Sequence, residues 1–76
     1  DRERKKRKYE VLILINKYDS LVFAKLETNK IKNLGLFFED MDEKIAVFSG
    51  PFNNNDINLK LDFLIRNGYL DAKIYP

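Results

Sequence analysis

Four of the twelve acidic residues of this chain gather at one place that could bind a cation. Glu39 and Asp40 are separated from Asp42 and Glu43 by a single methionine. Carboxylate oxygens suit Ca²⁺ and Mg²⁺, but such a site needs several ligands that converge on one point. The chain has neither histidine nor cysteine, which removes the commonest ligands of transition metals. A solvated acidic turn is therefore favoured over a metal site, and no cofactor is expected.

No combination of residues points to catalysis. The sequence holds no glycine-rich phosphate loop, and without histidine no hydroxyl has the usual base to pair with it. The segment Asn53–Asp56 is strongly polar, but its side chains are typical caps of a helix start. The sequence therefore predicts a non-catalytic protein.

The chain has 76 residues, enough for one domain. Its basic side chains are unevenly distributed. Residues 1–8 hold six basic and two acidic residues and no apolar one, whereas residues 9–76 hold eight basic and ten acidic residues. We expect a flexible linker at residues 1–8, with anionic lipid or nucleic acid as the alternative ligands of its charge. Residues 9–76 are expected to form the domain. The longest apolar run, Val11–Ile15, is too short to span a membrane.

Hydrophobic periodicity predicts alternating strands and helices. Val11–Ile15 is a short run rich in β-branched residues, and Lys44–Ser49 alternates as a half-buried strand does. Ile57, Leu61 and Leu64 recur at the spacing of one helical face. In chain order we expect a strand at 11–15, a helix at 19–33, strands at 36–40 and 44–49, a helix at 54–67 and a strand at 69–75.

The segment Leu21–Ala24 would suit a strand as well as a helix. An internal repeat favours the helix, because Gly35 and Gly68 become equivalent at an offset of 33 residues. Each half of the chain then reads as strand, helix, glycine and strand. The resulting order, β-α-β-β-α-β, is the split pattern of ferredoxin-like α+β folds.

Two short motifs frame the last predicted helix. Ser49–Phe52, with the sequence Ser-Gly-Pro-Phe, precedes the helix, and Gly68-Tyr69 closes it. Together with the spacing of Ile57, Leu61 and Leu64, these motifs resemble the second half of a SPOR (sporulation-related repeat) domain. That family shows a Gly-Pro-Phe after its third strand and a helix that ends in Gly-Tyr or Gly-Phe.

The resemblance, which extends over residues 9–76, implies a fold, a ligand and a location. It implies a four-stranded antiparallel sheet with both helices on one face. The open face would bind the glycan strands of peptidoglycan at bacterial division sites. Members of the family are usually exported, often as parts of membrane-anchored envelope proteins. We therefore expect the cell envelope or periplasm, with the membrane reached only through an anchor of the parent protein.

Alternation along the strands assigns side chains to the open face. If Ile13, Ile15, Ile45 and Val47 face the helices, the residues between them face the other way. The candidate glycan-binding or interaction residues are Leu12, Leu14, Lys44, Ala46 and Phe48 on the face, and Asn16, Lys17, Lys44, Lys73 and Tyr75 at its rim.

Two other kinds of partner remain open. Leu14 stands where the SPOR family usually has glutamine and Ala46 where it has arginine, so the expected face is largely apolar. A second copy of the chain or a protein partner would cover such a face. RNA-recognition domains share the topology, but Lys44–Phe48 lacks their aromatic motif. The charge of −2 that the counts give residues 9–76 also opposes phosphate binding, so nucleic acid is not an expected partner.

Overall fold

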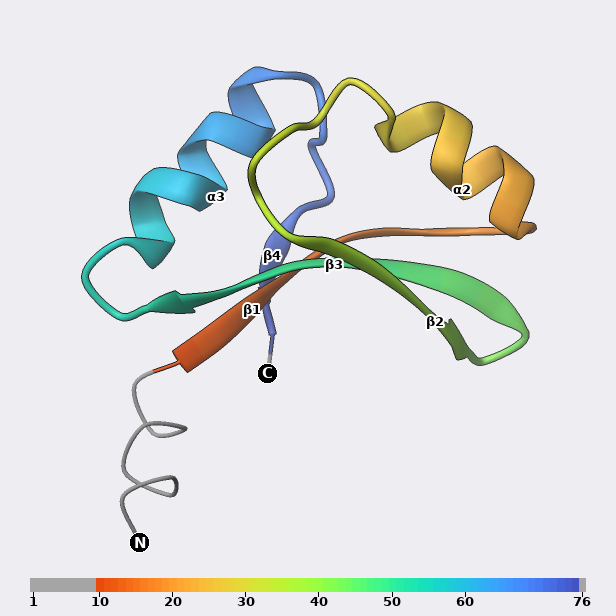
Figure 1. The fold of residues 1–76 in the computed structure, drawn as a ribbon, viewed down its shortest axis with the longest axis horizontal. Helices are drawn as coiled ribbons and strands as arrows, with labels where there is room; N and C mark the ends of the chain where they lie inside the picture. The colour runs from red at the N-terminus through yellow and green to blue at the C-terminus, as the bar shows by residue number, and fades with distance from the viewer. Residues whose placement is uncertain (1–9, 76) are drawn as a thin grey trace, which may run out of the picture.

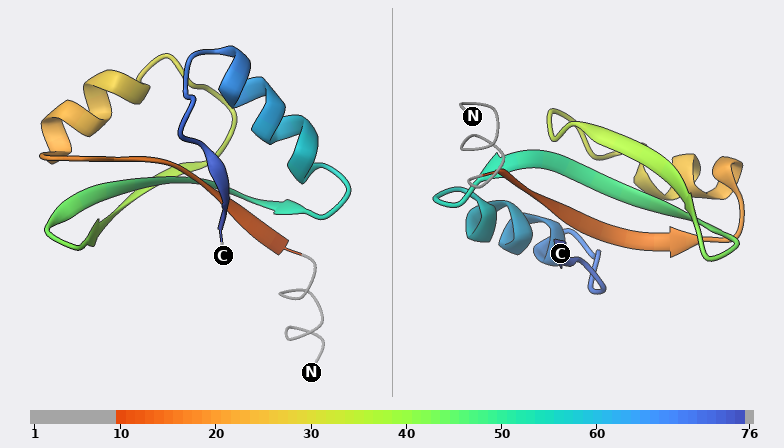
Figure 2. Two further views of the ribbon diagram at one scale, coloured as in Figure 1. Left: turned by 180° about the vertical axis from the view of Figure 1, so that it is seen from behind. Right: turned by 90° about the horizontal axis from the view of Figure 1, so that it is seen from below.

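The computed structural model describes residues 10–75, and the linker predicted at residues 1–8 lies outside them. The elements are, in chain order, β1 (Glu10–Tyr18), α2 (Leu21–Thr28), β2 (Leu36–Met41), β3 (Lys44–Asn53), α3 (Ile57–Arg66) and β4 (Lys73–Tyr75). The strands form one antiparallel sheet in the order β2-β3-β1-β4. Both helices lie on the same face of this sheet (Figures 1 and 2). The predicted α+β, ferredoxin-like fold is confirmed.

A hydrophobic core fills the space between the sheet and the helices. Ile13 and Ile15 of β1, Val47 of β3 and Leu64 of α3 are each 0% exposed. Apolar residues at alternate positions of a strand reach one face of the sheet, which explains why the two central strands dominate this core. We call the set the helix-side core; its buried members are Ile13, Ile15, Tyr18, Ala24, Leu34, Val47, Ile57, Leu64 and Ala72.

Helix α2 resolves the ambiguity of Leu21–Ala24 in favour of a helix. Its start is capped by Ser20, whose Oγ accepts a hydrogen bond from the backbone N–H of Phe23 at 3.2 Å. The helix ends at Thr28 and not at Asn33 as predicted. Residues 29–33 contain a single apolar residue, so a longer helix would have almost no apolar face to pack against the sheet.

The two glycines that the repeat makes equivalent have different roles. Gly35 does not end a helix; it leads into β2 with a φ of 64°. A Cβ atom there would lie 2.8 Å from the carbonyl oxygen of Gly50, so the close approach of these two backbones requires a glycine. Gly68 ends α3 as predicted, with a φ of 100°. The next residue, Tyr69, donates its N–H to the carbonyl of Leu64 at 3.0 Å, the pattern of a glycine-terminated helix.

An irregularity in the pairing of β1 with β3 changes the face that side chains reach. Leu14 pairs with Phe48 and Asn16 pairs with Val47, so β1 has one residue, Ile15, with no counterpart in β3. Such a bulge breaks the simple alternation of side chains. Because Val47 belongs to the helix-side core, its partner Asn16 lies on the helix side as well.

The ends of the other elements also differ from the prediction. β3 passes through Gly50-Pro51 and continues to Asn53, because a second register shift places that dipeptide opposite the single residue Leu12. Proline is tolerated at a bulge of this kind. Helix α3 begins later than predicted, since the Oδ1 of Asn53 accepts the N–H groups of Asn55 and Asp56, both at 3.0 Å, and holds them in a turn. β1 is longer and β4 shorter than the sequence pattern indicates.

Candidate functional site: the open sheet face

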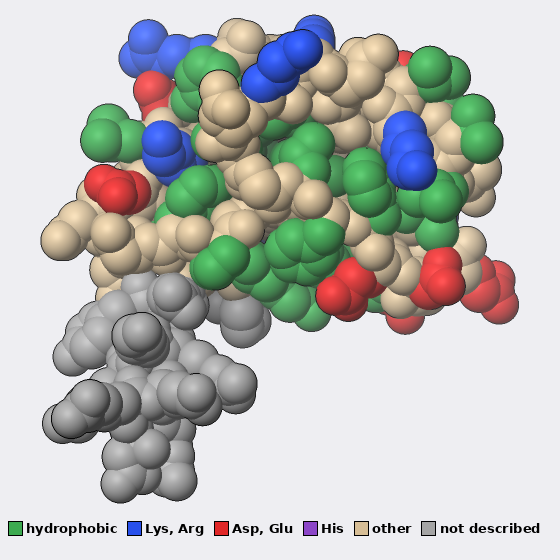
Figure 3. Space-filling model, in the orientation of Figure 1, with side chains coloured by type: hydrophobic (Ala, Val, Ile, Leu, Met, Phe, Trp, Pro, Cys, Tyr) green, Lys and Arg blue, Asp and Glu red, His purple; other side chains and the backbone are tan. Residues whose placement is uncertain are grey.

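The sheet face that the helices leave uncovered carries a second apolar cluster. Leu14 of β1 and Ala46 and Phe48 of β3 form its centre and are 6%, 0% and 2% exposed. Figure 3 shows hydrophobic side chains along the lower edge of the molecule, beneath the sheet. We call the whole set the open-face cluster; around its centre pack the half-buried residues Leu12, Phe37, Met41 and Tyr75.

Three aromatic rings from three different strands occupy the middle of the open-face cluster. The ring of Phe37 stacks on that of Phe48, with centroids 5.4 Å apart and planes at 21°. The ring of Tyr75 meets Phe48 edge-on at 4.9 Å. Direct pairing of Phe37 with Phe48 across β2 and β3 explains the first contact. Phe48 is therefore covered from two sides, while the two outer rings stay half-buried and accessible.

The structure differs here from the uncovered apolar patch that the sequence predicts. Leu12, Leu14, Ala46 and Phe48 do lie on this face, but the centre of the patch is buried. The covering residues come partly from β2, whose Phe37 was not among the candidates. Alternation along Leu36–Met41 would have placed Phe37 and Met41 on the same face.

The predicted lysines of the rim have different surroundings. Lys17 Nζ lies 3.2 Å from Asp42 Oδ2, and Lys44 Nζ lies 3.0 Å from Asp19 Oδ1. Both ion pairs stand near the turn between β2 and β3. Lys73 of β4 pairs with Leu14 of the open-face cluster and is exposed. Its ammonium has no carboxylate oxygen within 4.0 Å among residues 10–75. Of the three lysines, Lys73 is thus the one best placed to meet a ligand on this face.

Asn16 is not a residue of the open face. The bulge at Ile15 turns it to the helix side, where it lines a polar cavity together with Tyr18. Prediction from strict alternation was wrong for this residue, because a bulge depends on the pairing of two strands and leaves no clear mark in either one.

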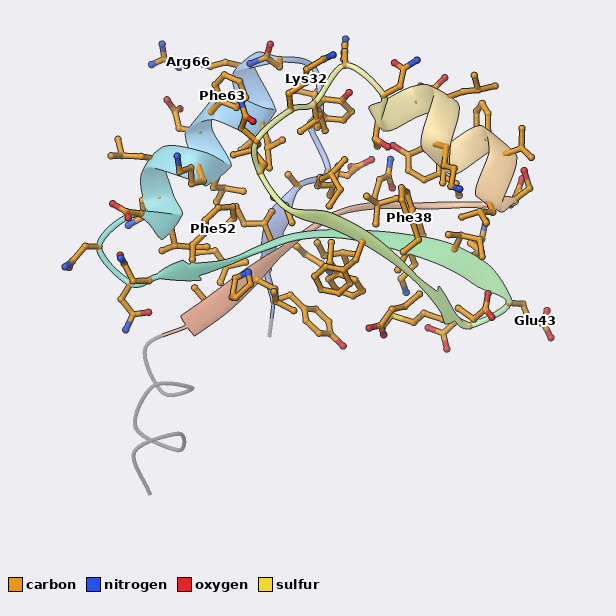
Figure 4. All side chains as sticks on the ribbon, in the orientation of Figure 1. Lys32, Phe38, Glu43, Phe52, Phe63 and Arg66 are labelled. Atoms are coloured by element: carbon orange, nitrogen blue, oxygen red, sulfur yellow. The ribbon has the colours of Figure 1, made fainter. Side chains whose placement is uncertain are left out.

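The acidic side chains lie at the end of the β2–β3 hairpin. Figure 4 shows Glu43 at the tip of this turn, directed away from the molecule. Within residues 10–75, no three side chains of His, Cys, Asp or Glu are grouped so that they could hold a metal ion. In the same range, none of the helices has the length and apolar character needed to cross a membrane.

Comparison of the chain with protein-family models, with curated proteins and with solved structures gives no match.

Proposed function

We propose that the domain is a non-catalytic binding module of the bacterial cell envelope, similar to SPOR domains, which binds peptidoglycan glycan strands across its open sheet face. The observation that carries the proposal is the aromatic group of Phe37, Phe48 and Tyr75 on the face without helices. Sugar rings present C–H groups that pack against aromatic rings, and such rings offer a large, rigid contact area. The Ser49–Phe52 and Gly68-Tyr69 motifs support the same ligand class.

The spacing of the outer rings suits an extended ligand. The centroid distances of 5.4 Å and 4.9 Å to Phe48 place the rings of Phe37 and Tyr75 no more than 10.3 Å apart. One chain of sugars that runs across the strands can therefore contact both rings. Lys73 lies two residues before Tyr75 on the same face of β4, and its ammonium can donate hydrogen bonds to sugar oxygens or pair with a carboxylate.

Pelleting with purified peptidoglycan sacculi tests this proposal. We expect the domain to sediment with sacculi, and more so after an amidase has removed the stem peptides. The double variant Phe37→Thr, Tyr75→Thr should lose most of this binding, because it removes the accessible rings but keeps residues that favour strands. Its circular dichroism spectrum should match that of the wild type.

A matched control removes apolar surface from the other side of the molecule. Leu59 and Phe63 of α3 are 70% and 50% exposed, and Figure 4 shows Phe63 beside Lys32, far from the open face. The double variant Leu59→Gln, Phe63→Gln should pellet like the wild type. Failure of the folded wild type to pellet, or equal losses in the two double variants, would contradict glycan binding on this face.

The apolar character of the open-face cluster favours a second candidate, self-association. All seven of its members are apolar or aromatic, and a second copy of the chain would cover the four that are half-buried. Sedimentation velocity over a wide concentration range distinguishes the two candidates. A dimer that the Phe37→Thr, Tyr75→Thr variant converts to a monomer supports self-association. A wild type that stays monomeric at high concentration excludes it.

A further inference from the structure

A polar cavity lies on the opposite side of the sheet from the open face, where the C-terminal ends of the two helices meet the end of β1. The volume of this cavity is about 320 Å³. Its lining residues are Asn16, Tyr18, Glu27, Lys30, Asn67, Gly68, Tyr69, Leu70 and Asp71.

The cavity volume of about 320 Å³ lies at the lower end of the range for small-molecule sites, roughly 300–1,000 Å³. It therefore has room for a single ring and not for a longer chain. Side chains with hydrogen-bonding groups dominate its lining, in contrast to the apolar open-face cluster. The cavity and the open face are thus separate sites with different chemistry.

Tyr18 is the residue of the cavity wall best placed to contact a ligand. Its side chain is largely buried, with the residue 8% exposed, and it lines the cavity. Burial raises the pKa of Tyr18 most, and the nearby Tyr69 and Glu27 of the cavity wall raise it further. A hydrogen bond from the Asn16 side chain lowers this pKa, as a donor to the phenol oxygen does. Among residues 10–75 the Tyr18 O–H has no hydrogen-bond acceptor of its own. Because no buried side-chain polar atom in this range lacks a partner, the hydroxyl is accessible from the cavity that Tyr18 lines and is available to a ligand.

Tyr69 fixes the opposite wall of the cavity. Its hydroxyl donates to the backbone carbonyl of Glu27 at 2.8 Å and so ties the turn after α3 to the end of α2. The Nζ of Lys30 lies 5.6 Å from the centroid of the Tyr69 ring, within the range of a cation–π contact. Burial and, next, the Glu27 carboxylate raise the pKa of Tyr69. Both phenols of the cavity are therefore protonated near neutral pH and keep their donor hydrogens.

The cavity wall carries charges of both signs. The carboxylates of Glu27 and Asp71 oppose an anion, and the ammonium of Lys30 offsets one of the two carboxylates, so the attraction for a simple cation is weak. The amide nitrogen of Asn67 already donates to the carbonyl of Phe63 at 2.7 Å, which leaves its oxygen as an acceptor. The cavity wall thus offers both donors and acceptors, as suits hydroxyl groups, each of which donates and accepts.

We propose that this cavity binds one neutral, polyhydroxylated ring, such as a single sugar unit, with the Tyr18 hydroxyl as a hydrogen-bond donor. The proposal does not rest on glycan binding at the open face, because none of the cavity residues belongs to the open-face cluster. The two sites can therefore be tested separately.

Titration of the ¹⁵N-labelled domain, followed by NMR, tests the proposal with N-acetylglucosamine as the probe. We expect saturable shifts of the backbone amide signals of residues 16–18 and 67–71. Tyr18→Phe should weaken binding roughly 2- to 10-fold, the effect of one lost hydrogen bond, and should preserve the fold because the hydroxyl has no protein acceptor. Lys32→Gln, an exposed change outside the cavity, and the Phe37→Thr, Tyr75→Thr variant should bind the probe like the wild type.

Four results would overturn the proposal. The first is the absence of saturable shifts at the cavity, and the second is unchanged binding by Tyr18→Phe. The third is an equal response to methylammonium or acetate, which would show that charge and not hydroxyl groups is recognised. Shifts confined to the open face would also overturn it and would leave glycan binding on that face supported.

Discussion

The two faces of the sheet bury apolar residues by different means. On the helix side, Ile13 and Ile15 are fully buried beneath two helices. On the open face, Leu14 and Phe48 are nearly as buried, but neighbouring side chains of the sheet cover them. Helices seal the first cluster, whereas the second keeps a half-buried border that a ligand can reach. The first cluster serves stability, and we propose that the second combines stability with binding.

The largest expected effect is on the helix side. Leu64 of α3 is 0% exposed, and its truncation in Leu64→Ala should lower the free energy of unfolding by about 2–5 kcal/mol, through lost burial and the cavity that remains. Urea denaturation measures this loss. Leu61→Ala is the matched control, because Leu61 lies on the same helix but is only partly buried, and it should cost less. An equal or larger cost for Leu61→Ala would contradict the assigned depth of the two residues.

A smaller effect is expected at the centre of the open face. Phe48→Leu keeps an apolar side chain but removes the contacts of the ring with Phe37 and Tyr75. Each aromatic pair contributes about 0.5–1.5 kcal/mol beyond burial, so we expect a loss of about 1–3 kcal/mol in the same urea experiment.

The outcome for Phe48→Leu sharpens the comparison of the two faces. A loss within the expected range, together with weaker binding to sacculi, would show that one ring serves both stability and recognition. A loss near zero would mean that Phe48 has little part in a second core, and the account of the open face would be wrong.

The sequence allowed the order of the elements and the direction of most strand side chains to be predicted. Ile13, Ile15 and Val47 lie on the helix side, and Leu14 and Phe48 on the open face, as two-residue alternation indicates. These positions are predictable because alternation is a property of each strand alone. The glycine stop at the end of α3 is local in the same sense.

Features that depend on the pairing of distant segments were not predictable. The bulge that turns Asn16 to the helix side exists only in the register of β1 with β3. Gly35 matches Gly68 in sequence, but its conformation follows from its contact with Gly50, fifteen residues away. Burial of Phe48 likewise follows from Phe37 on the neighbouring strand. The face of the candidate site and two residues of its accessible border, Leu12 and Tyr75, were therefore identified, while the border residues Phe37 and Met41 were missed.

The smallest expected effect concerns the ion pairs near the hairpin end of the open face. The Lys17 and Asp42 side chains are 34% and 80% exposed, and those of Lys44 and Asp19 are 51% and 87% exposed. Solvent screens such pairs, so Lys17→Gln and Lys44→Gln should each lower the free energy of unfolding by no more than about 1 kcal/mol. The loss should shrink further in 1 M salt, where the screening length is about 3 Å.

Urea denaturation at low and high salt compares these variants with a control. The control is Lys73→Gln, since Lys73 has no such ion pair among residues 10–75. A salt-independent loss above about 2 kcal/mol for either paired lysine would contradict this expectation, because it would show that the lysine side chain contributes through packing and not through its charge.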